Sequence, residues 1–297
     1  MTTRIELTPL IPPMRWLLYI AAVLVFLAGV ELFVFPLRTA DWFAWTVNPP
    51  MTAVFLGASY WASAVLEVAG ARSASWDRAQ LAVWPVFVFT TLILGVTLLH
   101  LDRFHVGGEF PPLAHLATWI WLGIYAFVPV AMLVLSWVQT RVRRPAAEVV
   151  TIVRLPLPPG LRVLLVAIAI VLMVLGVALL VAPLSAAVLW PWELTELTGR
   201  AVGAWLVGLG WAAGQGQLSG DADAVRPVGL TAVAFFVLQV IALLRHGEAI
   251  SWTSPQAIGY AVMLLAIGAA GVWALGLVRS RVVEPDPAAR EGRATAT

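Results

Sequence analysis

Eight long apolar stretches, separated by short polar or proline-containing segments, divide the chain. A helix needs about 20 consecutive apolar residues to cross the hydrocarbon core of a bilayer, and the stretches approach or exceed that length. They cover residues 15–36, 51–70, 79–100, 113–139, 161–183, 200–216, 228–245 and 256–278. The sixth is the shortest and needs its flanking residues to reach across. The pattern predicts an all-α integral membrane protein with eight transmembrane helices.

The chain also contains an internal repeat. Residues 14–37 align without a gap with residues 161–184, at an offset of 147 residues. The similarity extends to Trp45 and Trp192, and it resumes after a short insertion with Trp61 opposite Trp211. With four helices per copy, both copies enter the membrane from the same side, so the repeats are related by an axis along the membrane normal. We expect two parallel four-helix repeats.

These expectations divide the chain into four parts. Residues 1–140 form the first four-helix transmembrane repeat, 141–160 an extended cytoplasmic linker, 161–282 the second four-helix transmembrane repeat, and 283–297 a disordered cytoplasmic tail. The first apolar stretch is longer than the 7–15-residue apolar region of a signal peptide. We therefore interpret it as a retained helix.

The arginines predict the orientation. All eighteen basic residues are arginine, and fourteen of them lie on the side that carries both termini. The other side has Arg38, Arg103, Arg200 and Arg245. Because cytoplasmic loops are enriched in basic residues, we expect a plasma-membrane protein with cytoplasmic N- and C-termini. Its expected partner is the lipid bilayer and not nucleic acid, with a membrane-protein partner or a homo-oligomer as open alternatives.

Composition excludes several kinds of chemistry. The chain has no cysteine, which excludes disulfides, thiolate metal sites and thiol nucleophiles. It has no lysine, which excludes Schiff-base catalysis. The sequence contains no P-loop, GxSxG, HExxH or dinucleotide-binding motif. Since no histidine lies in the middle of a predicted span, the sequence also lacks the ligands of a membrane b-type haem.

The stretch HLDRFHVGGEF at 100–110 is unusually polar for this chain. Imidazole and carboxylate groups are ligands that a divalent metal such as zinc prefers, and all four histidines of the protein fall near one predicted face. The candidate metal ligands are His100, Asp102, His105, Glu109, His115 and His246. A divalent metal is therefore the one cofactor that the sequence suggests.

The spacing of these residues favours a second interpretation. His100 and His105 would lie about 140° apart on a helix, so a shared metal requires the chain to leave helical geometry near Asp102. Alternatively, the histidines are hydrogen-bonded residues at the membrane boundary, and Asp102 pairs with Arg103. Both interpretations stay open.

Glu31 and Glu67 are the two carboxylates within predicted spans. A charge costs about 2.5–3.5 kcal/mol at the bilayer centre; neither residue lies there, Glu31 being near the outer end and Glu67 near the inner end of its span, and each is a candidate ligand-binding residue. Glu67 is matched by Gln217 in the repeat, which favours a packing or hydrogen-bonding role. Glu31 is matched by Ala178, so its role is confined to the first half: it binds a cation or a proton near the outer face, or extends to the headgroups.

The outer loops contain several tryptophans, and a short interfacial helix is expected there in each repeat. Tryptophan is enriched at both membrane–water interfaces, so we interpret these residues as anchors in the headgroup layer. They are Trp42, Trp45, Trp190, Trp192 and Trp252.

Three functions fit this sequence. The first is binding or transport of a small or hydrophobic solute between the two repeats. Few polar residues lie at the predicted midplane, where Thr90, Thr91 and Gln239 stand out, and this favours a hydrophobic ligand. The alternatives are an accessory or structural membrane subunit, and an outer-face metal-binding protein or enzyme that uses the 100–115 loop.

Overall fold

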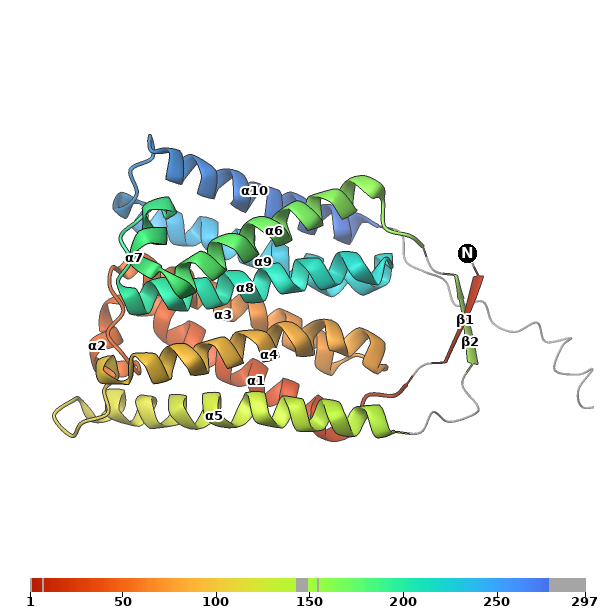
Figure 1. Cartoon of the computed structure of the whole chain (residues 1–297), viewed down its shortest axis with the longest axis horizontal. Helices are drawn as coiled ribbons and strands as arrows, with labels where there is room; N and C mark the ends of the chain where they lie inside the picture. Colours follow the sequence, from red (N-terminus) through yellow and green to blue (C-terminus); the bar gives the residue numbers. More distant parts are fainter. Residues whose placement is uncertain (1, 7, 143–148, 154, 278–297) are drawn as a thin grey trace, which may run out of the picture.

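The computed structural model describes residues 2–6, 8–142, 149–153 and 155–277. Within these residues, eight long helices run side by side in one bundle (Figure 1). They are α1 (Pro12–Gly29), α3 (Pro50–Ala71), α4 (Trp76–Leu99), α5 (Pro112–Arg141), α6 (Pro159–Val181), α8 (Glu196–Ser219), α9 (Ala222–His246) and α10 (Pro255–Gly276). Five of them begin on a proline, whose fixed φ and missing N–H suit the first helical turn.

Short segments connect the helices at the two ends of the bundle. We call one end the loop end; it carries α2 (Thr39–Trp42), α7 (Pro183–Ala186) and the 3-10 turns η2 (Pro36–Arg38), η3 (Leu101–Arg103), η4 (Ala187–Leu189) and η5 (Gly247–Ala249). The other is the sheet end, where β1 (Thr2–Glu6) and β2 (Val149–Val153) lie (Figure 1). The expected short helix after the first helix of each half is confirmed by α2 and α7.

The long helices pack in four neighbouring pairs that are joined by further contacts. α1 lies against α3 and α6 against α8, while α4 lies against α5 and α9 against α10. Two further contacts, α3 with α9 and α4 with α8, connect these pairs. As a result α3 and α8 are the most enclosed helices, with more than half of their residues buried.

The outside of the bundle is apolar. Large aliphatic and aromatic side chains are exposed along α1, α5, α6 and α10, among them Trp16, Phe127 and Val163. Soluble proteins rarely expose a contiguous apolar patch of more than a few hundred Å². Seven of the described helices are long and apolar enough to cross a membrane. The chain is therefore a helical, multi-pass membrane protein.

Helix α8 is the long helix that falls short of this apolarity. It contains the predicted stretch 200–216 and extends it to Glu196 and Ser219. α4, α6 and α9 surround this helix. Small residues let helices approach closely, so glycine and alanine are suited to its surface. The weak apolar signal of this helix thus has a structural cause.

Part of the predicted linker is a β-strand. This strand, β2, pairs antiparallel with β1, so that Thr2 is opposite Val153 and Glu6 is opposite Val149. The expectation of an extended connection missed this pairing because it joins segments far apart in the sequence. The rest of the prediction for this region is not tested, since residues 143–148 and the tail at 283–297 lie outside the described residues.

The role predicted for the loop-end tryptophans is wrong for three of them. Trp45, Trp190 and Trp192 are only 2%, 6% and 4% exposed, so they belong to the core and do not face the headgroups. Trp252 is half exposed, as an anchor would be. Large aromatic rings bury more area than other side chains, and here they close the end of the bundle.

Candidate functional site

The polar stretch at 100–110 leaves helical geometry, as a metal site there would require. α4 ends at Leu99, and η3 follows it directly. His105 is buried, but both of its ring nitrogens have protein partners. Nδ1 lies 2.9 Å from the Phe43 carbonyl oxygen, and Nε2 lies 3.1 Å from the Thr46 hydroxyl. This histidine therefore ties its own loop to the segment after α2.

His115 also has partners at both ring nitrogens, and His100 has one at Nε2. His115 Nε2 accepts a hydrogen bond from the Trp119 indole at 3.2 Å, and Nδ1 lies 3.3 Å from the His105 carbonyl oxygen. His100 Nε2 accepts a hydrogen bond from Arg200 at 2.7 Å. Burial, followed by the charge of Arg200, lowers the pKa of His100 below its ordinary value of 6.5.

The remaining candidate metal ligands are exposed or have other partners. Asp102 pairs with Arg103 at 3.1 Å on the surface, and Glu109 is exposed. His246 lies 3.6 Å from Glu248. No three histidine, aspartate or glutamate side chains of the described residues are grouped so that they could hold a metal. The metal site stays a prediction, and the observed hydrogen bonds favour a structural role for these residues.

Glu31 and Glu67 lie in different halves of the bundle's length. Glu31 is in the π-helical segment η1 (Val30–Val34), which continues α1 at the loop end. Glu67 is 1% exposed and lies one turn before the end of α3 at the sheet end. Its Oε2 has no partner among the described residues, and the hydroxyl of Ser63, one turn earlier, donates to the Tyr60 carbonyl oxygen at 3.0 Å. The two carboxylates do not form one site.

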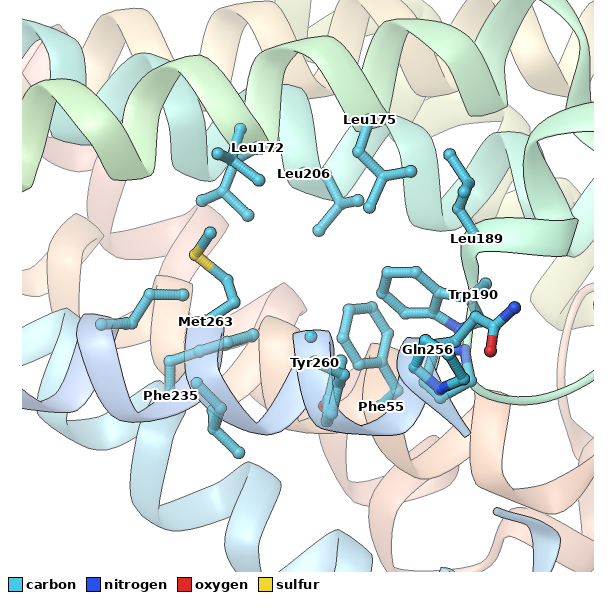
Figure 2. A pocket seen from close by; sticks show the side chains of 16 residues that line it. Phe55, Leu172, Leu175, Leu189, Trp190, Leu206, Phe235, Gln256, Tyr260 and Met263 are labelled. Carbon is cyan, nitrogen blue, oxygen red and sulfur yellow. The ribbon is translucent and has the colours of Figure 1, made fainter. Parts of the chain in front are cut away.

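The structure contains a well-defined cavity between α6 and α10, with a volume of about 320 Å³ (Figure 2). Residues at its mouth, such as Val171 and Leu189, are exposed on the outside of the bundle, whereas Phe55, Leu206 and Phe235 at its floor are almost fully buried. The cavity therefore opens toward the lipid and extends into the core. The lining residues on α6 and α10 are Val171, Leu172, Leu175, Pro255, Gln256, Gly259, Tyr260, Met263, Leu264 and Ile267.

Aromatic rings form the wall of this cavity at the loop end. Trp190 contacts Phe55, Trp192 and Tyr260, with ring centroids 5.4, 5.0 and 5.7 Å apart. The Tyr260 hydroxyl donates to Gln239 Oε1 at 3.2 Å, and Gln239 donates to the Phe55 carbonyl oxygen at 3.1 Å. Among the described residues, Trp190 Nε1 is a buried donor without a partner. The wall is therefore apolar, because its polar atoms are paired or buried.

The location of the cavity differs from the expected site between the two halves. Its helices α6, α8, α9 and α10 all belong to the second half, and α3 contributes Phe55 from the first half. At the junction itself, a shallower groove runs along α4, α6 and α8, where Trp84, Met173 and Trp211 line it. The α6–α10 cavity thus lies mainly within the second half of the chain.

A second cavity, of about 470 Å³, lies between α1 and α5. Its lining is apolar apart from one carboxylate, that of Glu31, and it includes Trp42 near the loop end. Sequence reasoning selected Glu31 because a charge in a span is conspicuous. It missed the apolar lining of both cavities, because leucines at helical spacing have the same pattern whether they face a core or a hollow.

Comparison of the chain with protein-family models, with curated proteins and with solved structures finds no match.

Proposed function

We propose that this protein spans the membrane eight times as two parallel four-helix repeats, with both termini in the cytoplasm, and that it binds a small hydrophobic molecule in the cavity between α6 and α10. The cavity carries the proposal of function. The packing of the helices and the distribution of arginine support the proposed architecture.

The helix contacts are consistent with a two-fold relation between the halves. Exchanging α1 with α6, α3 with α8, α4 with α9 and α5 with α10 turns each observed packing pair into another observed pair. The contact of α3 with α9 becomes that of α8 with α4, so the exchange also reproduces the contacts between the halves. This is the pattern that a repeat with an axis along the bundle would produce.

The two cavities add support at the level of single residues. α5 and α10 both begin on a proline, Pro112 and Pro255, which are 143 residues apart. Every α5 residue that lines the α1–α5 cavity has its α10 counterpart, at this same offset, in the lining of the α6–α10 cavity. The pairs are Leu113 and Gln256, Leu116 and Gly259, Ala117 and Tyr260, Ile120 and Met263, Trp121 and Leu264, and Ile124 and Ile267.

The contacts favour a different register for the second helix of each half. A β-carbon on Gly29 would meet Trp61, and one on Gly176 would meet Val207. Since Gly29 and Gly176 are partners in the gapless alignment, Trp61 corresponds to Val207. The sequence alignment had paired Trp61 with Trp211, four residues or about one helical turn further along.

Helix α8 has the length that an eighth span requires. Its 24 residues extend about 36 Å at 1.5 Å per residue, which exceeds the hydrocarbon thickness of about 30 Å. The absence of cysteine makes a test simple: single Glu193→Cys and Ser219→Cys variants are labelled with a membrane-impermeant maleimide in oriented vesicles. Labelling from opposite sides is expected, and labelling from one side would reject the eighth span.

The arginines indicate which end is cytoplasmic. Described arginines at the sheet end include Arg72, Arg78 and Arg141, whereas the loop end has Arg38, Arg103, Arg200 and Arg245. With Arg4, Arg15, Arg162 and Arg226, the described residues have seven arginines at the sheet end against four at the loop end, an excess that is typical of the cytoplasmic side.

The chemistry of the α6–α10 cavity indicates its ligand class. A volume of about 320 Å³ is at the lower end of the range for small-molecule sites, which are mostly apolar with a few polar groups. An alkyl chain or a compact apolar ring system would contact the leucines and aromatic rings.

Photolabelling tests this site. Dodecanol with a diazirine on its chain is crosslinked to the protein in lipid nanodiscs, and labelled peptides are mapped by mass spectrometry. We expect label on α6 and α10, lost in Gly259→Phe because that side chain would fill the cavity. Gly123→Phe on α5 is the matched control, since a β-carbon meets open space at both positions. Equal labelling of all lipid-facing helices, unchanged by Gly259→Phe, would reject the proposal.

A further inference from the structure

We propose that the cavity between α1 and α5 binds an amphiphile with a cationic head group, a long-chain amine or quaternary ammonium, with its charge at Glu31 and its chain between the two helices. This inference rests on the proposal that cavities of this bundle accept apolar molecules. It adds a second site whose ligand is selected by charge.

The first observation is the position of Glu31 in the cavity wall. The side chain is half-buried and lies among leucine, alanine, isoleucine and aromatic residues. Exposed residues such as Leu113 and Leu116 also line the cavity, so the space is open toward the lipid. A chain entering from the bilayer would thus reach a carboxylate without leaving apolar surroundings.

The second observation is that Glu31 has no ion partner within the described part of the chain. The two arginines of this region are otherwise engaged. Arg38 pairs with Asp41 at 3.1 Å, and Arg245 donates to the Phe33 carbonyl oxygen. A carboxylate in apolar surroundings is costly unless it is paired. A cation supplied by a ligand would provide the missing partner.

The third observation is local backbone geometry at Glu31. α1 changes from α-helix to π-helix at Val30–Val34, whereas α6 stays α-helical through Ala178, the alignment partner of Glu31. Single π-helical turns occur often at functional sites. The carboxylate and the π-helical turn therefore occur together in the first half and are both missing from the second.

An aromatic ring complements the carboxylate. Trp42 lines the same cavity, and the guanidinium of Arg38 already lies 5.6 Å from its ring centroid. Tryptophan is the best aromatic partner for a cation, and quaternary ammonium groups are often held this way. The cavity between α6 and α10 has no charged residue in its lining, so it is suited to neutral chains.

The test compares two probes of equal chain length, dodecyltrimethylammonium and dodecanol, by equilibrium dialysis against the protein in nanodiscs, with empty nanodiscs as the blank. We expect Glu31→Gln to weaken dodecyltrimethylammonium binding at least tenfold and to change dodecanol binding less than twofold. Glu31→Asp keeps the charge and should retain part of the affinity. Glu248→Gln removes an exposed carboxylate at the same end and serves as the control.

A gain of binding provides a second readout. Ala178→Glu places a carboxylate one turn beyond Leu175 of the other cavity, and it should create a second site for dodecyltrimethylammonium. Unchanged affinity in Glu31→Gln, or an equal loss of both probes, would overturn the inference. Failure of dodecanol to bind the wild type would instead reject the proposed function of the α6–α10 cavity, so the two failures are distinguishable.

Discussion

The closest approach of α6 and α8 gives a quantitative prediction about the bundle. A β-carbon on Gly203 would lie 2.7 Å from the Gly176 carbonyl oxygen and 3.1 Å from the Leu180 nitrogen. Ordinary contacts of this kind begin near 3.4 Å. Since the obstacles are backbone atoms, Gly203→Ala requires the two helices to separate by several tenths of an ångström. Overpacking of this kind costs about 1–3 kcal/mol, and we expect a loss of that size in the free energy of unfolding.

The measurement is reversible unfolding by sodium dodecyl sulfate in mixed micelles, followed by circular dichroism. Gly95→Ala on α4 is the control, because a β-carbon there meets open space. It should be neutral or stabilising by about 0.5–1 kcal/mol, the usual gain of alanine over glycine in a helix. If both substitutions change the unfolding free energy by the same amount, backbone contact between α6 and α8 is not what requires glycine.

Three further predictions concern the polar groups. Gln239→Leu should lower the free energy of unfolding by about 1–3 kcal/mol because it leaves the Tyr260 hydroxyl unpaired. Adding Tyr260→Phe should recover most of that loss. A double-mutant cycle in which the two energies are additive would contradict this. Because the pKa of His100 in the folded protein is below 6.5, the unfolded state binds the proton more readily. The free energy of unfolding should therefore fall as the pH drops below about 6.5 and stay constant at higher pH. Thermal melts in which His100→Gln shows the same pH dependence as the wild type would contradict this. Since the ring nitrogens of His105 and His115 have protein partners, elemental analysis after chelator-free purification should find no stoichiometric metal that a double alanine substitution removes.

The long helices were predictable because each consists of one continuous apolar stretch. Outer helices such as α6 face lipid along much of their surface, so their sequences are apolar throughout. α8 gave the weakest signal, because α4, α6 and α9 enclose it and glycine replaces larger residues at its contacts. The sequence alignment pairs Trp61 with Trp211, but Trp61 packs on Gly29 while Trp211 is exposed, so two tryptophans in different surroundings looked equivalent.

The candidate site was less predictable than the fold. Glu31 stood out as a charge in a span, but its apolar surroundings depend on α1 and α5, which are far apart in the sequence. The histidines at 100–115 attracted attention by composition alone. Their hydrogen bonds to Phe43, Thr46 and Arg200 depend on tertiary contacts that no local pattern reveals.

The central claim, that the bundle holds an apolar ligand between α6 and α10, is tested most directly by an experimental structure of the protein with 12-bromododecanol. Bromine gives an anomalous signal that locates the chain. We expect a bromine peak inside the cavity lined by Leu175, Tyr260 and Met263. Bromine found solely on the outer surface of the bundle, with the cavity empty or closed by side chains, would contradict it.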